Sequence, residues 1–333
     1  MKYLNIFVIL VLFVFGCVNA DSSSANGVNL LSVSTLQSFN QINILNSDNG
    51  VSFNHTFSCQ GNLEDVLFYD DNTGSVLLMT RSGIGFTFYL YSVDTVSLVQ
   101  VGYVPIEGGE AYMHRTQRYV YNSQSKTVYL VVSTPSSPVN ILEIEVAGGK
   151  MNFIPIAAPY PNSSPSAIQA FDAINSILYI TYIDTTGGVS IVSVDTTTYT
   201  VIKSYSTIDN VFNGLVNFMF TNQNGQLFLV KPTRYSQTSI TICRVDFGTT
   251  ENTCADLLNV EIGDYTTKYQ PYIVNGDNSK LMLIMMGTSN NITTTFNLNL
   301  LDINNNFTSE LVNIPIDNNW YLSSEIYRFY FNF

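Results

Sequence analysis

The sequence predicts an all-β protein whose strands form a six-bladed β-propeller, and two observations carry this prediction. The first is a degenerate repeat of roughly fifty residues that runs along the chain. The second is that the two chain ends hold complementary parts of one further repeat. Short apolar and alternating runs recur throughout, whereas apolar runs with a helical period are almost absent.

The first strand of each repeat ends on an aromatic or apolar residue. These strand-ending positions are Tyr69, Tyr121, Phe171, Phe220, Val274 and Phe331. Five of them precede polar turns, such as 70–74 and 221–225. Asn, Asp, Gly and Ser favour turns because they bond locally to the backbone or tolerate positive φ. We therefore expect a hairpin after each of these strands.

The remaining three strands of each repeat follow in a fixed order. The second strands are apolar runs at 76–79, 128–132, 178–180, 227–230 and 281–284. The third strands end on Asp94, Asp195, Asp246 and Asp302, and the second repeat has Ala147 in place of this Asp. The fourth strands often close on a Pro-Ile or Glu-Ile pair, at 105–106, 155–156, 261–262 and 315–316. Each repeat is therefore expected to be one four-stranded blade.

The chain ends supply the sixth blade together. Residues 327–333 read as a first strand with nothing after it, whereas 26–31, 41–46 and 51–58 match a second, third and fourth strand. Sharing one blade between the ends is how a propeller ring closes. An open solenoid would need polar caps, which the aromatic C-terminus does not resemble. One or two β-sandwiches are the alternative for many short strands, but the complementary ends favour the ring.

Residues 1–20 are typical of a secretory signal peptide. Lys2 is followed by an apolar run at 6–15 and a small-residue cleavage site at 18–20. The run is short for a membrane span, and no comparable stretch follows it. We therefore expect a secreted protein without a transmembrane segment, in which residues 21–333 form a single domain.

Sequons and cysteines fit an extracellular protein. The N-glycosylation sequons beyond the signal are Asn54, Asn162, Asn291 and Asn306. Asn54 and Asn306 lie in predicted fourth strands, where a glycan would also block edge pairing. Cys243 and Cys254 fall in adjoining third and fourth strands, so we predict a hairpin disulfide between them. Cys59 is left over, either as a buried thiol at a strand end or as an intermolecular link.

Charge and motif content narrow the possible functions. The formal net charge of −12 argues against nucleic acid and anionic membranes as partners, because both require basic patches. The sequence contains no zinc-binding cysteine pairs, no His-Glu-x-x-His, no phosphate-binding loop and no Gly-x-Ser-x-Gly elbow. We assign no catalytic residue and favour a function other than catalysis.

The strongest candidate for a binding site is the segment 107–118, which concentrates Glu107, Glu110, His114, Arg115 and Arg118 in a charge-poor chain. It joins the fourth strand of one repeat to the first strand of the next. In a propeller such connections gather on one face around the central channel. Other candidates expected on that face are Glu64, Asp209, Asp264, Tyr269 and Trp320.

Each of these candidates also has a simpler interpretation. The two arginines of the segment would neutralise its two glutamates on a solvated loop, and exposed pairs of this kind contribute little to stability. Trp320 is the only tryptophan of the chain. It would serve either as a core residue or as a stacking platform for a sugar or peptide.

The strand pattern resembles the general six-bladed class that includes the tyrosine-tryptophan-threonine-aspartate family and the senescence-marker/gluconolactonase family. The resemblance covers the chain beyond residue 20 but consists of the strand pattern alone. The four-residue motif of the first family is absent, and the metal site of the second does not map onto particular residues here. The resemblance therefore implies a fold and no activity.

Three functions follow from these observations. The favoured one is a secreted, N-glycosylated, monomeric propeller without a cofactor, which binds an extracellular protein or glycan through its loop-rich face. The second is a hydrolase or lactonase that holds a divalent cation such as calcium in a carboxylate-lined channel, with His114 as general base. The third is a structural extracellular protein without a small-molecule site.

Overall fold

The computed structural model describes the following residues: 29–36, 39–46, 50–70, 73–82, 85–105, 120–122, 124–134, 137–146, 150–156, 163–184, 189–206, 218–222, 224–232, 239–247, 253–258, 270–274, 280–289, 292–302, 308–315 and 328–332. The predicted signal peptide at 1–20 lies outside them.

Within these ranges the chain forms six four-stranded antiparallel sheets. The sheet that holds both chain ends consists of β24 (Arg328–Asn332), β1 (Asn29–Leu36), β2 (Phe39–Asn46) and β3 (Gly50–Phe57). The next three sheets consist of β4 (Asn62–Asp70), β5 (Ser75–Ser82), β6 (Gly85–Ser92) and β7 (Ser97–Pro105); of β8 (Val120–Asn122), β9 (Thr127–Thr134), β10 (Ser137–Glu145) and β11 (Lys150–Pro155); and of β12 (Ser163–Asp172), β13 (Ile177–Asp184), β14 (Val189–Asp195) and β15 (Thr200–Ser206). The last two consist of β16 (Phe218–Thr221), β17 (Leu227–Pro232), β18 (Ser239–Val245) and β19 (Thr253–Leu258); and of β20 (Gln270–Val274), β21 (Lys280–Ser289), β22 (Ile292–Asp302) and β23 (Thr308–Pro315).

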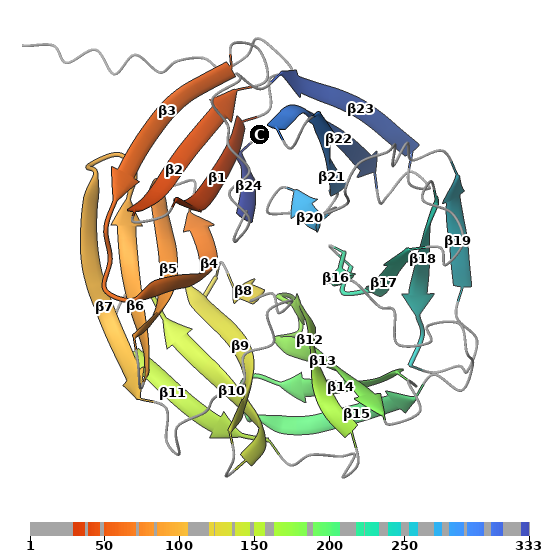
Figure 1. The fold of residues 1–333 in the computed structure, drawn as a ribbon. Helices are drawn as coiled ribbons and strands as arrows, with labels where there is room; N and C mark the ends of the chain where they lie inside the picture. The colour runs from red at the N-terminus through yellow and green to blue at the C-terminus, as the bar shows by residue number, and fades with distance from the viewer. Residues whose placement is uncertain are drawn as a thin grey trace, which may run out of the picture.

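The sheets are arranged around a common centre (Figure 1). Strands β8, β16, β20 and β24 lie toward that centre, whereas β3, β7, β19 and β23 lie on the rim. Neighbouring sheets contact one another through their inner strands, because β24 contacts both β4 and β20, and β12 contacts both β8 and β16. The fold is therefore all-β and propeller-like.

The two chain ends meet in one sheet, as the sequence predicts. The C-terminal strand β24 pairs antiparallel with β1, and Leu30 lies opposite Phe331. On its other edge β1 pairs with β2, which in turn pairs with β3. Three strands from the start of the chain and one from its end thus complete a four-stranded sheet.

The core lies between the faces of neighbouring sheets. Along β5, Val76 and Leu78 pack in a cluster with Ile42 of the sheet on one side. Leu77 and Met79 pack instead with residues of the β8–β11 sheet on the other side. Successive side chains of a strand point to opposite faces, so a run of apolar residues fills both interfaces. Each fully buried side chain of this kind contributes about 1.5–3 kcal/mol.

The turns that follow the first and third strands lie at the same end of the strands in the described sheets. We call this end of the sheets the turn edge. In three sheets, a backbone N–H after the third strand donates to a carbonyl oxygen in the turn after the first strand: Val93 to Gly74 at 2.7 Å, Val146 to Lys126 at 3.1 Å and Thr196 to Ser176 at 2.9 Å. The positive φ required at these positions suits Gly74 at 58°, but Lys126 and Ser176 adopt it as well, each at 55°.

The opposite edge is the connection edge, where the chain leaves one sheet and enters the next. Strand β7 ends there at Pro105, which is paired with Gly85, and β8 begins at Val120. The sequence ranges that join successive sheets are 58–61, 106–119, 156–162, 207–217, 259–269 and 316–327. The inter-sheet connections therefore share one edge with the hairpins between second and third strands, such as Ser82↔Gly85, whereas the turns after the first and third strands lie at the other edge.

Candidate functional site

Glu64 is the one predicted ligand-binding residue that lies among the described residues. The other candidates, which lie outside them, are Glu107, Glu110, His114, Arg115, Arg118, Asp209, Asp264, Tyr269 and Trp320. By their positions in the sequence these nine belong to the inter-sheet connections. For the candidate site, the structure therefore describes Glu64 and the ends of the strands next to the inter-sheet connections.

Glu64 lies in β4 close to the connection edge and is half-buried. Its neighbours Leu63 and Asp65 lie opposite Thr80 and Met79, so Glu64 is an extra residue in the ladder, as in a β-bulge. Bulges re-aim side chains and are common next to active sites. The local register therefore places an acid at an irregular point of the first strand of this sheet.

A second irregularity lies at the matching end of β12. Pro165 is paired with Tyr182 and Gln169 with Ile180, so β12 carries extra residues between these two pairs. Like β4, β12 is the first strand of its sheet. Proline provides no backbone N–H to the ladder, and a bulge is one of the places in a sheet where it is tolerated. The first strands of two sheets, β4 and β12, are therefore irregularly paired close to the connection edge.

The polar side chains of the turn edge serve structural roles. Side-chain Oδ1 atoms accept two backbone N–H groups each, at 2.7–3.3 Å, and the accepting residues are Asn122, Asp172, Asp195 and Asn222. Hydrogen bonds from Thr197 lower the pKa of the Asp195 carboxyl. Asp172 and Asn222 are buried. Each of these groups holds its own turn in place.

A polar contact joins two neighbouring sheets. The Tyr199 hydroxyl donates to Glu143 Oε1 at 2.6 Å, and Asn152 Nδ2 donates to Glu143 Oε2 at 2.8 Å. Burial, followed by the adjacent Glu143 carboxylate, raises the pKa of the Tyr199 hydroxyl. A tyrosine that keeps its proton remains a donor to the carboxylate. This group therefore links β10 and β11 to the turn between β14 and β15, and its described contacts are structural.

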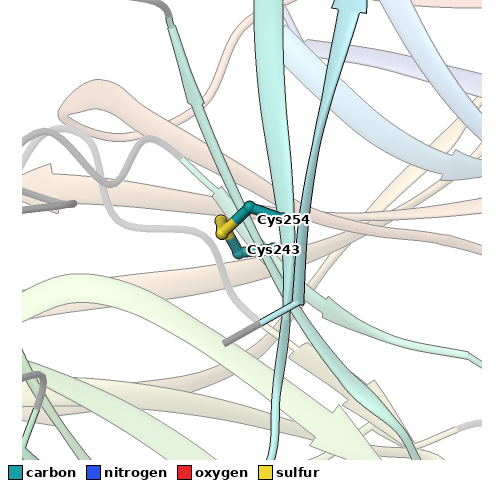
Figure 2. Close-up of a disulfide and its surroundings, with 2 residues drawn as sticks. All are labelled: Cys243 and Cys254. Carbon is teal, nitrogen blue, oxygen red and sulfur yellow. A yellow bond between two sulfur atoms is a disulfide. The ribbon is translucent and has the colours of Figure 1, made fainter. Parts of the chain in front are cut away.

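The predicted disulfide between Cys243 and Cys254 is present (Figure 2). The two residues lie directly opposite each other on β18 and β19. Cys59 is a free, half-buried thiol that follows β3, and Asn40 Nδ2 donates to its sulfur at 3.2 Å. Burial raises the pKa of the Cys59 thiol. The sequence led us to expect a buried thiol at a strand end, and the structure places Cys59 just after β3 but only half-buried.

Metal ligands and membrane spans can be assessed for the described residues alone. Among them, no three His, Cys, Asp or Glu side chains gather closely enough to hold a metal ion. The same part of the chain contains no helix that is long and apolar enough to cross a membrane. Of the predicted sequons, Asn54 lies in β3, whereas Asn162, Asn291 and Asn306 are outside the described residues.

Comparison with protein-family models finds no match to this sequence. An uncharacterized protein of Dictyostelium discoideum is 27% identical over 213 residues, which cover 62% of this chain and 56% of that protein. The chain thus spans about half the length of this curated relative. At this level of identity the relative does not establish a family.

Among solved structures, TolB from Acinetobacter baumannii matches with a TM-score of 0.51 and 10% identity, over 87% of this chain and 64% of that one. A nidogen/laminin complex matches with a TM-score of 0.49 and 12% identity, over 85% and 92% of the two chains. An uncharacterized protein of Listeria monocytogenes matches with a TM-score of 0.48 and 13% identity, over 87% and 81%. TolB has a β-propeller-like fold, and the likeness concerns the fold alone.

Proposed function

We propose that this chain is a secreted, N-glycosylated β-propeller that binds an extracellular protein or glycan through its connection edge, without catalysis. Residues 21–333 then form one domain of six blades, and the blade built from both chain ends closes the ring. The pairing of β24 with β1 supports closure, and the six four-stranded sheets of the described residues support the blade count.

The observation that carries the proposal is the contrast between the two edges of the sheets. At the turn edge, polar side chains such as Asn122 and Asp172 are occupied by the backbone of their own turns. At the connection edge lie the bulged Glu64 and the ends of the inter-sheet connections. Binding residues concentrate on loops held by a rigid scaffold. The connection edge is therefore the better place for a ligand.

Secretion is supported by two independent features of the chain. The signal-like residues 1–20 precede the first described strand. The Cys243–Cys254 disulfide belongs to an oxidising compartment, since cytosolic thiols are kept reduced. Asn54 offers a sequon on β3, the outermost strand of its sheet. A glycan there would lie at the rim and leave the connection edge accessible.

A binding assay with matched variants tests the proposal. The purified secreted chain is applied to arrays of extracellular-matrix proteins and of glycans, and the affinity for each hit is measured. The double variant Glu107→Gln/Glu110→Gln should weaken binding by more than about tenfold, because charge-assisted contacts contribute 1.5–3 kcal/mol each. The control Asp94→Asn/Glu145→Gln changes two exposed acids at the turn edge and should bind as the wild type does.

Equal loss of affinity in both variants would contradict binding at the connection edge. Binding to no array component would instead favour the structural extracellular protein. Circular dichroism and unfolding curves of both variants establish that any loss of binding does not reflect misfolding.

A metal-dependent hydrolase is the second candidate, and the position of Glu64 on the first strand of its sheet is the observation that favours it. A divalent cation that binds the native state would raise the melting temperature by mass action. The melting temperature is therefore measured with EDTA and then with added calcium. A fall with EDTA that calcium reverses would favour the hydrolase, and no shift would favour binding without metal.

A further inference from the structure

We infer that Cys254 is a thiol-exchange site, at which an external thiol forms a mixed disulfide and releases Cys243 as a buried thiol. The inference goes beyond the proposed function and does not depend on it. It rests on the unequal exposure of Cys243 and Cys254, which form the disulfide drawn in Figure 2.

Cys243 is enclosed by protein. It lies on β18, between β17 and β19, and is 0% exposed. Its neighbours form an apolar cluster shared by two sheets, which includes Tyr179, Met219 and Leu229. A thiolate that approaches from solvent would have to displace this packing before it reached the Cys243 sulfur.

Cys254 is the exposed residue of the pair. It belongs to β19, which is the last strand of its sheet and lies on the rim (Figure 1). The β18–β19 ladder extends from Ser239↔Leu258 to Arg244↔Thr253. The disulfide therefore ties an edge strand to an interior strand, with one accessible residue and one enclosed residue.

Access decides which sulfur of a disulfide an external thiolate attacks. Attack of a monothiolate such as glutathione on Cys254 Sγ forms a new S–S bond and breaks the bond to Cys243. The electron pair of the broken bond goes to Cys243 Sγ, and this sulfur takes up the proton that the glutathione thiol gave up when it became the attacking thiolate. A second thiolate that attacks the glutathione sulfur would release Cys254 as a thiolate and form oxidised glutathione. The two electrons that reduce the protein disulfide come from the two glutathione thiols.

The sheet should remain folded after the mixed disulfide has formed at Cys254. A free cysteine packs as a small apolar residue, so Cys243 can remain within its cluster after its bond is cut. Strand β19 should keep its backbone pairing with β18, which extends over six residue pairs in the disulfide-bonded protein. Exchange then leaves a substituent on the rim of a folded protein, which makes Cys254 a point for reversible covalent attachment of a small thiol or of a partner's cysteine.

The site is tested on the oxidised full chain under native conditions. The protein is incubated with reduced glutathione, quenched with acid, unfolded in the presence of an alkylating reagent, and mapped by peptide mass spectrometry. The glutathione adduct on Cys254 should exceed that on Cys243 by more than about tenfold, because buried cysteines are inert. The same incubation in denaturant, where both sulfurs are accessible, should remove this preference.

Two results would overturn the inference. One is an adduct distributed evenly between Cys243 and Cys254 under native conditions. The other is the absence of any adduct until denaturant is added, which would show that the bond is closed to thiols. Cys59 is an internal reference for the alkylation step. It is a half-buried free thiol that takes no part in the disulfide, so it should be alkylated whether or not glutathione attacks the disulfide. Ligand binding by the adduct-bearing protein is measured separately on the arrays. The outcome for thiol exchange can therefore be distinguished from the outcome for the proposed function.

Discussion

The hydroxyl of Tyr199 donates a hydrogen bond to Glu143 Oε1 at 2.6 Å, across the boundary between two neighbouring sheets. Glu143 lies in β10, whereas Tyr199 ends the turn before β15, at a φ of 56°. Asn152 holds the second carboxylate oxygen at 2.8 Å. The carboxylate is therefore fixed by its own sheet and by the next one, so this contact is expected to stabilise the packing between them.

Replacing Tyr199 with Phe should lower the free energy of unfolding by about 1–2 kcal/mol, since a hydrogen bond to a charged group is lost. Urea unfolding measures this change. Tyr103→Phe is the matched control, because Tyr103 is exposed on β7 and should lose little. Equal stability of the two variants would mean that the contact with Glu143 contributes nothing to the packing.

Asp172 is a buried carboxylate that caps its own turn. Its Oδ1 accepts from the backbone of Ile174 and Asn175 at 3.0 and 3.2 Å, and its Oδ2 accepts from Asn175 Nδ2 at 2.7 Å. Asn122 and Asn222 cap the corresponding turns with an amide oxygen. The turn therefore needs an oxygen at this position but not a charge.

Asp172→Asn should change the free energy of unfolding by less than about 1 kcal/mol, whereas Asp172→Ala should lower it by about 1–3 kcal/mol, because the backbone N–H groups of Ile174 and Asn175 lose their acceptor. Chemical denaturation of both variants checks this order. If the two variants lost the same amount of stability, the charge and not the cap would be what the fold requires.

Gly225 lies where a side chain would collide with the neighbouring sheet. Its φ is 72°, and a β-carbon there would lie 2.5 Å from Asp172 Oδ2. Gly225→Ala should therefore lower stability by about 1–3 kcal/mol. Ser176→Ala is the control, because Ser176 already adopts a φ of 55° with a β-carbon in place. A thermal or urea midpoint that moves equally in both variants would contradict the proposed collision.

Tyr179 makes stability depend on alkaline pH. Burial, followed by the nearby Asp172 carboxylate, raises the pKa of Tyr179 from 10.0 to about 12. The native state therefore holds this proton more tightly than the unfolded chain does. The resulting stabilisation is fully present below pH 10 and is lost as the pH rises to about 12.

Unfolding midpoints between pH 8 and 12 should fall less steeply for Tyr179→Phe than for the wild type. Asp172→Asn should also reduce the slope, because it removes one of the two causes of the raised pKa. A wild-type profile that stays flat through this range would contradict the assignment.

The sequence predicts the strands well because turn residues and apolar runs, the two patterns that mark a strand, are both local. A turn such as 221–225 is encoded by its own residues, and the burial of both faces of β5 follows from a continuous apolar run. The pairing of β24 with β1 was also predictable, because each chain end lacks what the other supplies. Cys243 and Cys254 were predictable as a pair from their positions on adjoining strands.

Other features depend on contacts that no local pattern encodes. Glu143 and Tyr199 meet because two sheets pack at a particular distance. The positive φ of Lys126 arises from the turn it occupies, although its residue type does not favour that conformation. The bulge at Glu64 is a property of how β4 pairs with β5. For the candidate site, the sequence offers candidate residues, of which Glu64 alone lies among the described residues, and the register around Glu64 comes from the structure.

The most direct test of the central claim is hydrogen exchange of the chain, free and bound to the protein or glycan selected on the arrays. Binding at the connection edge predicts slower exchange in peptides that cover 106–119 and 259–269, with no change in the turn peptides 122–127 and 172–177. Protection confined to the turn peptides or to the rim strands would contradict the claim.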